Sequence, residues 1–310
     1  FAGRHRTAVA GEFRGPGIVM SRPPTLLLIR GLGHSGTTIL DLALGAHPLV
    51  MGLGEAARIL KTPEPGEEQR GPAMLRGSQR QDRLCTCGAT AKDCPIWGPA
   101  LEWLVAHDHL SLPDKMQRLM QFSSAMPSAT GEPHRVIVDS FQDELVLPQA
   151  MPDQLDVRVI HLVRDVRSWL HSRLKPARAS AQPLSELRTL LRWWYVNRKF
   201  DRALQRCGRP VFRLGYEELA LQPERSLQLL CDWLALPYSD QMLSPGANST
   251  SHILSGNRMR FDPARSRAIR YDAAWMASND WLLRTALLIP AVAGLNRKLV
   301  YSNDVLQSFV

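Results

Sequence analysis

The chain lacks any apolar run long enough to cross a lipid bilayer, which takes about 20 consecutive apolar residues. Its longest apolar stretch, 286–295, contains Pro290 and is soon followed by Arg297. Residues 1–19 also lack the apolar segment of a secretory leader and are rich in Gly and Arg. We therefore expect no transmembrane segment, and the sequence leaves open only a peripheral contact of 286–295 with a membrane.

Cysteine is scarce, with five residues in a chain of 310, and this odd number argues against a secreted disulfide framework. Three of them form a group, Cys85, Cys87 and Cys94. This group could hold zinc together with His107 or His109, but the paired CxxC spacing of common zinc sites is absent. We expect reduced structural thiols in a cytoplasmic protein, or else a local disulfide, and no bound metal.

Acidic residues are outnumbered: 38 Lys and Arg face 29 Asp and Glu, which gives a net charge of +9. Such a balance indicates a negatively charged partner. The sequence has neither a block of lysines nor a stripe of alternating basic and aromatic residues, which argues against nucleic acid. The excess is almost all Arg, whose planar fork suits phosphate or sulfate. We therefore expect a small polyanionic ligand.

Short apolar runs typical of buried strands alternate with segments of helical spacing along the chain. The strand-like runs are 25–29, 135–139, 157–163 and 210–214, and the helical segments are about 97–107, 114–124, 166–174, 184–206 and 224–234. This alternation predicts an α/β fold with a parallel sheet flanked by helices on both faces. We expect one domain over 20–310 with a cysteine-containing surface insertion at 62–96. Residues 1–19 are expected to be an extension that is disordered or foreign to the domain.

A glycine-rich loop, 31–36, lies between the first strand and a helical segment at 37–45, with the GxxxxG spacing of a P-loop. Its backbone N–H groups and the helix N-terminus form an anion site. A P-loop NTPase has Lys directly after the second glycine, but this chain has Thr37. The loop thus favours phosphate binding without ATP hydrolysis, and a divergent P-loop nucleotide kinase or a purely structural turn are the alternatives.

Four segments together resemble the sulfotransferases that use 3′-phosphoadenylyl sulfate (PAPS), in particular bacterial members related to tyrosylprotein and carbohydrate sulfotransferases. The loop resembles their 5′-phosphosulfate site, and Arg164 with Ser172, eight residues later, resembles their 3′-phosphate site. Tyr216 and the pair Arg258 and Arg260 resemble later segments that reach the nucleotide. The loop residues that carry the likeness are Gly33, His34, Ser35, Gly36, Thr37 and Thr38. An ion pair of Arg164 with Asp165 or another carboxylate is the alternative.

The resemblance implies a transferase that moves a sulfuryl group from PAPS, its co-substrate, to a hydroxyl acceptor and releases adenosine 3′,5′-bisphosphate, without a metal. It implies a carbohydrate or another small molecule as the acceptor and leaves a phenol, a lipid headgroup or a peptide tyrosine open, and the cysteine segment suggests a bacterial source. It also implies that Glu55 is the catalytic base, and Asp139, at the end of a predicted strand, is the rival. A non-catalytic nucleotide-binding module is the remaining alternative.

Two cationic residues common in this family are missing here. His34 precedes Ser35 where the family usually has Lys or Arg, and Gln142 stands where bacterial members often have Lys. The ordinary pKa of His is about 6.5, so His34 is a cation only when protonated. We therefore expect His34 to assist catalysis in its charged form, with turnover that weakens above neutral pH more steeply than in a lysine-type enzyme.

Overall fold

The computed structural model describes residues 23–63, 65–66, 82–128, 130–174 and 183–301, and for 183–185 it describes the backbone only. The predicted extension at 1–19 lies outside the described residues, as do positions 64 and 67–81 of the predicted insertion.

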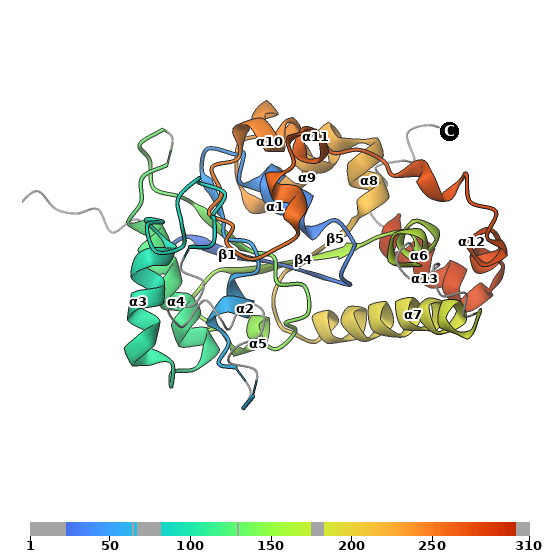
Figure 1. Cartoon of the computed structure of the whole chain (residues 1–310), viewed down its shortest axis with the longest axis horizontal. Helices are drawn as coiled ribbons and strands as arrows, with labels where there is room; N and C mark the ends of the chain where they lie inside the picture. The colour runs from blue at the N-terminus through green and yellow to red at the C-terminus, as the bar shows by residue number, and fades with distance from the viewer. Residues whose placement is uncertain (1–22, 64, 67–81, 129, 175–182, 302–310) are drawn as a thin grey trace, which may run out of the picture.

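A sheet of five parallel strands forms the centre of the molecule, in the order β2-β3-β1-β4-β5 (Figure 1). The strands are β1 (Thr25–Gly31), β2 (Val50–Gly52), β3 (Val136–Asp139), β4 (Val157–Val163) and β5 (Val211–Gly215). The first strand is central, with β3 on one side and β4 on the other. In a sheet of this kind a crevice opens where the strand order reverses, at the carboxyl ends of the strands.

Helices cover both faces of the sheet, which confirms the predicted α/β class. On β1, Leu26 and Leu28 pack into one core with α2, α3 and α4, while Leu27 and Ile29 pack into the other with α1 and α9. This division follows from the two-residue period of a strand. The helices over these faces are α1 (Thr37–Leu44), α2 (Ala56–Leu60), α3 (Trp97–His107), α4 (Leu112–Ser124), α5 (Leu147–Ala150), α8 (Tyr216–Leu221) and α9 (Pro223–Leu234).

A third apolar cluster lies beyond the end of β4, where Trp169 and Trp193 are fully buried. It is built from α6 (Val166–Leu174), α7 (Pro183–Gln205), α12 (Trp281–Thr285) and α13 (Pro290–Val300). Within the stretch 286–295, Ala286 and Val292 belong to this core, whereas Leu288 is 76% exposed. Among the described helices, none combines the length and the apolar composition that a membrane crossing requires.

After α9 the chain returns to the carboxyl edge of the sheet in short turns (Figure 1). These include α10 (Pro245–Asn248), η5 (Arg258–Phe261), α11 (Pro263–Ser266) and η6 (Ala273–Trp275). Of these, α10 and η5 contact α1, and η6 contacts α6. The backbone N–H groups of Thr250 and His252 donate to the carbonyls of Gly45 and Gly52. This late segment therefore closes over the region that follows β1 and β2.

Candidate functional site

A cavity of about 920 Å³ opens at the carboxyl edge of the sheet. The glycine-rich loop forms one wall, Arg164 after β4 and Ser172 near the end of α6 form another, and residues 255–272 of the late segment form a third. The predicted site residues that line it are Gly33, His34, Gly36, Thr37, Thr38, Glu55, Arg164, Ser172 and Tyr216. The fold thus brings most of the predicted residues to one place, although they come from five separate stretches of sequence.

The loop is held in a conformation that depends on Gly36. Its φ is +96°, and a Cβ atom there would lie 2.4 Å from Cδ2 of Tyr216. Both the left-handed backbone and the close aromatic ring therefore require glycine. The eight-residue helix α1 begins directly after it at Thr37, so its first backbone N–H groups face the cavity edge, where they favour an anion.

Arg164, directly after β4, contacts the glycine-rich loop. Its Nη1 donates to the carbonyl of His34 over 3.2 Å, and its Nε donates to Ser168 Oγ over 2.8 Å. Its Nη2 pairs with Asp272 Oδ2 at 2.7 Å, and the guanidinium lies 5.0 Å from the centre of the Tyr216 ring. The alternative of an ion pair for Arg164 is therefore realised, with Asp272 from the late segment and not with the adjacent Asp165.

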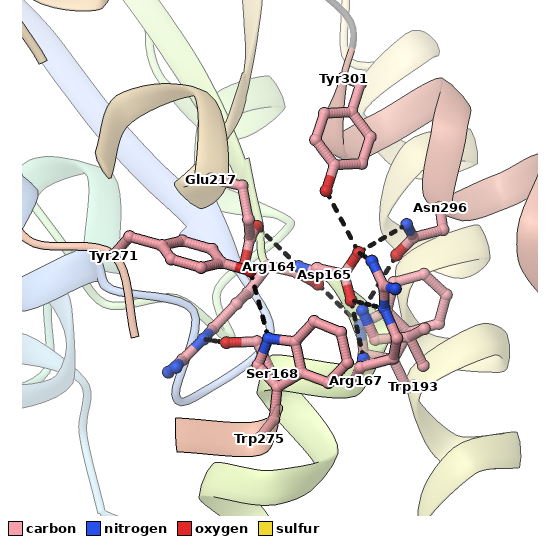
Figure 2. A network of polar contacts seen from close by, with 11 residues as sticks. Arg164, Asp165, Arg167, Ser168, Trp193, Glu217, Tyr271, Trp275, Asn296 and Tyr301 are labelled. Atoms are coloured by element: carbon pink, nitrogen blue, oxygen red, sulfur yellow. Dashed lines mark hydrogen bonds and ion pairs between the residues drawn. The ribbon is translucent and has the colours of Figure 1, made fainter. Parts of the chain in front are cut away.

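Asp165, the residue after Arg164, lies in a buried network of hydrogen bonds and ion pairs (Figure 2). The Asp165 carboxylate pairs with Arg167 and accepts a hydrogen bond from Asn296 Nδ2 on α13 at 3.0 Å. The backbone N–H of Asp165 donates to Glu217 Oε2 at 2.8 Å, and Trp193 Nε1 donates to the Arg164 carbonyl at 3.1 Å. These contacts hold the backbone at the end of β4, and so fix the point from which the Arg164 side chain extends.

His34 is uncharged in the geometry observed. Arg173 Nη1 lies 3.3 Å from His34 Nε2, and a guanidinium can only donate, so this nitrogen accepts. Nδ1 lies 3.4 Å from Ser172 Oγ. Partial burial, Arg173 and Arg164 together lower the pKa of His34 below its ordinary 6.5. The change of charge that we expected near neutral pH is therefore moved to more acidic pH, and His34 presents a neutral imidazole at pH 7.

Glu55 also lines the cavity, at the start of α2, with its side chain 12% exposed. Its Oε2 accepts hydrogen bonds from Arg58 Nη1 at 2.9 Å and from Ser255 Oγ at 3.2 Å. Asp139, the rival base, does not line the cavity. It is fully buried in an ion pair with Arg30 at 2.9 Å, and its Oδ1 accepts from the Ala57 N–H. Its contacts are those of a structural carboxylate beneath α2.

Three predicted residues lie outside the cavity lining. Ser35 is buried beneath the loop, and Arg258 is an exposed residue of η5. The guanidinium of Arg260 donates to the carbonyls of Leu254, Gly256 and Asn257, so it holds the late loop together from within. Burial lowers the pKa of Arg260 to about 10, which still leaves it charged at neutral pH.

Sequence reasoning missed several side chains of the cavity. The late segment contributes Ser255 and Asn257 in place of Arg258 and Arg260, and Gln142 lies beside Gly33. Asp272 also lines the cavity. Four further arginines line it: Arg58, Arg83, Arg265 and Arg270. The only signal for these arginines was the overall excess of Arg, since they follow no motif.

The three grouped cysteines meet a histidine that the sequence did not suggest. Ligand atoms of Cys85, Cys87, Cys94 and His252 all lie within 4.8 Å of one another. His107, one of the two candidates considered from sequence, instead stacks on Trp103 with the ring centres 4.4 Å apart.

The chain matches the model of a family described as the sulfotransferase family over residues 25–240. It is 25% identical over 298 residues to protein-tyrosine sulfotransferase 2 of Gallus gallus, covering 89% of this chain and 70% of that protein. It is 24% identical over 249 residues to protein-tyrosine sulfotransferase 1 of Danio rerio, covering 77% and 61%. The sulfotransferase domain of the Synechococcus PCC 7002 olefin synthase, a solved structure, is similar with a TM-score of 0.48 at 16% identity, covering 91% of this chain and 96% of that one.

Proposed function

This chain belongs to the sulfotransferase family and is therefore a transferase, and on that premise we propose that it moves a sulfuryl group from PAPS to the hydroxyl of an acceptor. One observation carries the proposal: the glycine-rich loop, the Arg164–Ser172 pair and Glu55 line the same cavity. Two anion sites and a carboxylate are the parts that transfer between a doubly phosphorylated nucleotide and a hydroxyl requires.

In this proposal the loop and the first turn of α1 hold the phosphosulfate, through backbone N–H groups and the hydroxyls of Thr37 and Thr38. Arg164 and Ser172 hold the 3′-phosphate. Arg164 is already directed to this place by its contact with the His34 carbonyl, and Tyr216 offers an aromatic face beside it. Arg260 acts indirectly, because it positions the loop that carries Ser255 and Asn257.

The proposed reaction consists of one proton transfer and the exchange of one bond at sulfur for another. Glu55 takes the proton of the acceptor hydroxyl, the acceptor oxygen bonds to sulfur, and the bond from sulfur to the bridging phosphate oxygen breaks. The leaving group is adenosine 3′,5′-bisphosphate, which keeps the bridging oxygen and its electron pair. Arg58, 2.9 Å from Glu55, and the four other lining arginines supply positive charge where the family usually has lysine.

Thermal unfolding with adenosine 3′,5′-bisphosphate tests the donor site. A ligand that binds only the folded state adds about 2.7 kcal/mol at a hundredfold excess over Kd, which is enough to measure clearly. We expect a rise in Tm with the bisphosphate and none with ADP and Mg²⁺. Arg164→Ala should weaken binding about 10- to 100-fold, since a charge-assisted hydrogen bond contributes about 1.5–3 kcal/mol.

Arg158→Ala is the matched control, because Arg158 lies on β4, the strand that leads to Arg164, in an ion pair with Asp156 but outside the cavity. A rise in Tm with ADP and Mg²⁺ alone would instead identify a divergent nucleotide kinase. Equal loss of binding in both variants would remove Arg164 from the site.

Transfer of labelled sulfate from PAPS tests the chemistry. The acceptor panel needs carbohydrates, phenols and a tyrosine peptide, the last because the two curated relatives are named as protein-tyrosine sulfotransferases. Glu55→Gln should reduce turnover about 10²- to 10⁴-fold, the usual contribution of a general base, and leave bisphosphate binding intact. A variant with unchanged turnover would exclude Glu55 as the base, and a wild type that binds without turnover on any acceptor would favour the non-catalytic module.

A further inference from the structure

Three thiols and one imidazole meet beside the late segment, although His252 is 158 residues from Cys94 in the sequence. The sulfur atoms of Cys85 and Cys94 are 3.7 Å apart, and Cys94 Sγ lies 3.3 Å from His252 Nδ1. Cys85 and Cys94 are buried, whereas Cys87 is exposed at the rim of the group.

These separations match the edges of a zinc tetrahedron. With Zn–S bonds of about 2.3 Å and Zn–N bonds of about 2.05 Å at tetrahedral angles, two sulfur ligands lie about 3.8 Å apart, and a sulfur and a nitrogen about 3.6 Å. The observed 3.7 and 3.3 Å are close to both values. A disulfide brings two sulfur atoms to about 2.0 Å and would leave Cys87 and His252 without a shared function.

Backbone hydrogen bonds order the segment that carries the cysteines. The Cys85 N–H donates to the Ala89 carbonyl at 2.9 Å, and the Cys94 N–H donates to the Thr90 carbonyl at 2.8 Å. The turn after Cys85 is closed by Gly88, whose φ of +88° suits glycine and whose N–H donates to the Cys85 carbonyl.

We propose that Cys85, Cys87, Cys94 and His252 form a structural zinc site. Four protein ligands complete the tetrahedron and leave no position open for water or substrate, which is the arrangement of a structural and not a catalytic zinc. This proposal replaces our expectation of a metal-free chain, which depended on the absence of the paired CxxC spacing of common zinc sites.

The proposed site joins the cysteine segment to the wall of the cavity. Trp97 Nε1 donates to the His252 carbonyl at 2.6 Å, and the Ile253 N–H donates to Thr86 Oγ1 at 2.9 Å. Three residues after His252, Ser255 donates to Glu55 Oε2 and accepts the Glu55 N–H at its own carbonyl. A metal at His252 therefore fixes the loop against which Glu55 is held.

Zinc content of the purified, untagged full chain tests the site without reference to sulfuryl transfer. After exchange into chelator-treated buffer, elemental analysis should give about one zinc per chain, and native mass spectrometry should show the same mass increment. Cobalt substitution should produce the visible absorption of a tetrahedral thiolate complex. A metal-free chain that takes up neither zinc nor cobalt under reducing conditions, or one lighter by two hydrogens as a disulfide requires, overturns the proposal.

Variants separate ligands from other cysteines. Cys87→Ser removes an exposed ligand without changing the core, and zinc should pass to a competing chelator at least tenfold faster than from wild type. Cys231→Ser, a buried cysteine of α9 outside the group, is the matched control and should retain zinc like wild type. Equal rates of zinc loss in Cys87→Ser and wild type would exclude Cys87 as a ligand. Because none of these measurements needs turnover, failure here and failure of the proposed function are distinguishable.

Discussion

Asp272 forms an ion pair with Arg164 at 2.7 Å, and its side chain is 34% exposed. A 3′-phosphate that binds Arg164 has to compete with this carboxylate or lie next to a like charge. We expect Asp272→Asn to bind adenosine 3′,5′-bisphosphate roughly fivefold more tightly, since an exposed ion pair contributes about 1 kcal/mol or less. Isothermal titration calorimetry measures the difference.

The control is Asp262→Asn, because Asp262 also caps a short helical turn of the late segment but does not line the cavity. Its affinity should equal that of wild type. Weaker binding by Asp272→Asn would show instead that Asp272 orients Arg164 for the phosphate.

The lowered pKa of His34 gives a second prediction for a single side chain. Above pH 7 the imidazole is neutral, so bisphosphate affinity should not respond to its titration there. At pH values below this lowered pKa the imidazole gains a proton and a positive charge, and wild type should then gain affinity for the bisphosphate relative to His34→Asn. Asparagine suits this control because it tolerates the φ of +74° at this position. Identical curves for both proteins from pH 5 to 8.5 would show that the His34 charge does not reach the ligand.

At the scale of elements, the junction between β1 and α1 depends on the contact between Gly36 and the first residue of α8. Gly36→Ala should cost about 1–2 kcal/mol for the left-handed backbone and, in addition, displace the Tyr216 ring. Gly208→Ala is the matched control for Gly36→Ala, because Gly208 also has a positive φ, +70°, but nothing lies within 4 Å of the added carbon. Chemical denaturation should show a loss in both variants, and bisphosphate binding should fall at least tenfold in Gly36→Ala alone. Unchanged binding in Gly36→Ala would show that the ring has no part in the site.

Regular elements could be predicted because their cores impose regular patterns. The central strands are apolar on both faces, and the expected helices at 97–107 and 166–174 coincide with α3 and α6. The three-residue β2 and the one-turn helices α10 and α11 are too short for a period to show. The sequence therefore predicted the sheet better than the connections around it.

The candidate site divides in the same way. The loop, Arg164 and Tyr216 follow strand ends, so parallel strands bring them to one edge, and the sequence could predict their convergence. Asp272, Arg265 and His252 reach their places through the irregular path of the late segment, which only tertiary packing determines. Arg260, predicted as a nucleotide contact, belongs to the same irregular segment, where it donates to the Leu254 carbonyl and does not line the cavity.

At the scale of the whole molecule, the net charge of +9 and the five arginines of the cavity both favour binding of an anion. They should attract a bisphosphate strongly at low ionic strength, and salt shortens the reach of such fields from about 10 Å at 0.1 M to about 3 Å at 1 M. We expect the Kd for the bisphosphate to rise about tenfold or more between 50 and 500 mM NaCl. Adenosine, which carries no charge, serves as the control ligand, and a salt-independent Kd for the bisphosphate would contradict this prediction.

The third wall of the cavity has a consequence for how the protein is made. The last strand ends at Gly215, whereas the wall extends to Asp272, 57 residues later in the chain. At a synthesis rate of about 5–20 residues per second, the ribosome needs roughly 3 to 11 s to deliver that stretch. During this interval a nascent chain can assemble all five strands but has no enclosed site. Nucleotide binding should therefore begin only once translation has passed Asp272, and it can stabilise only those chains that have reached that point.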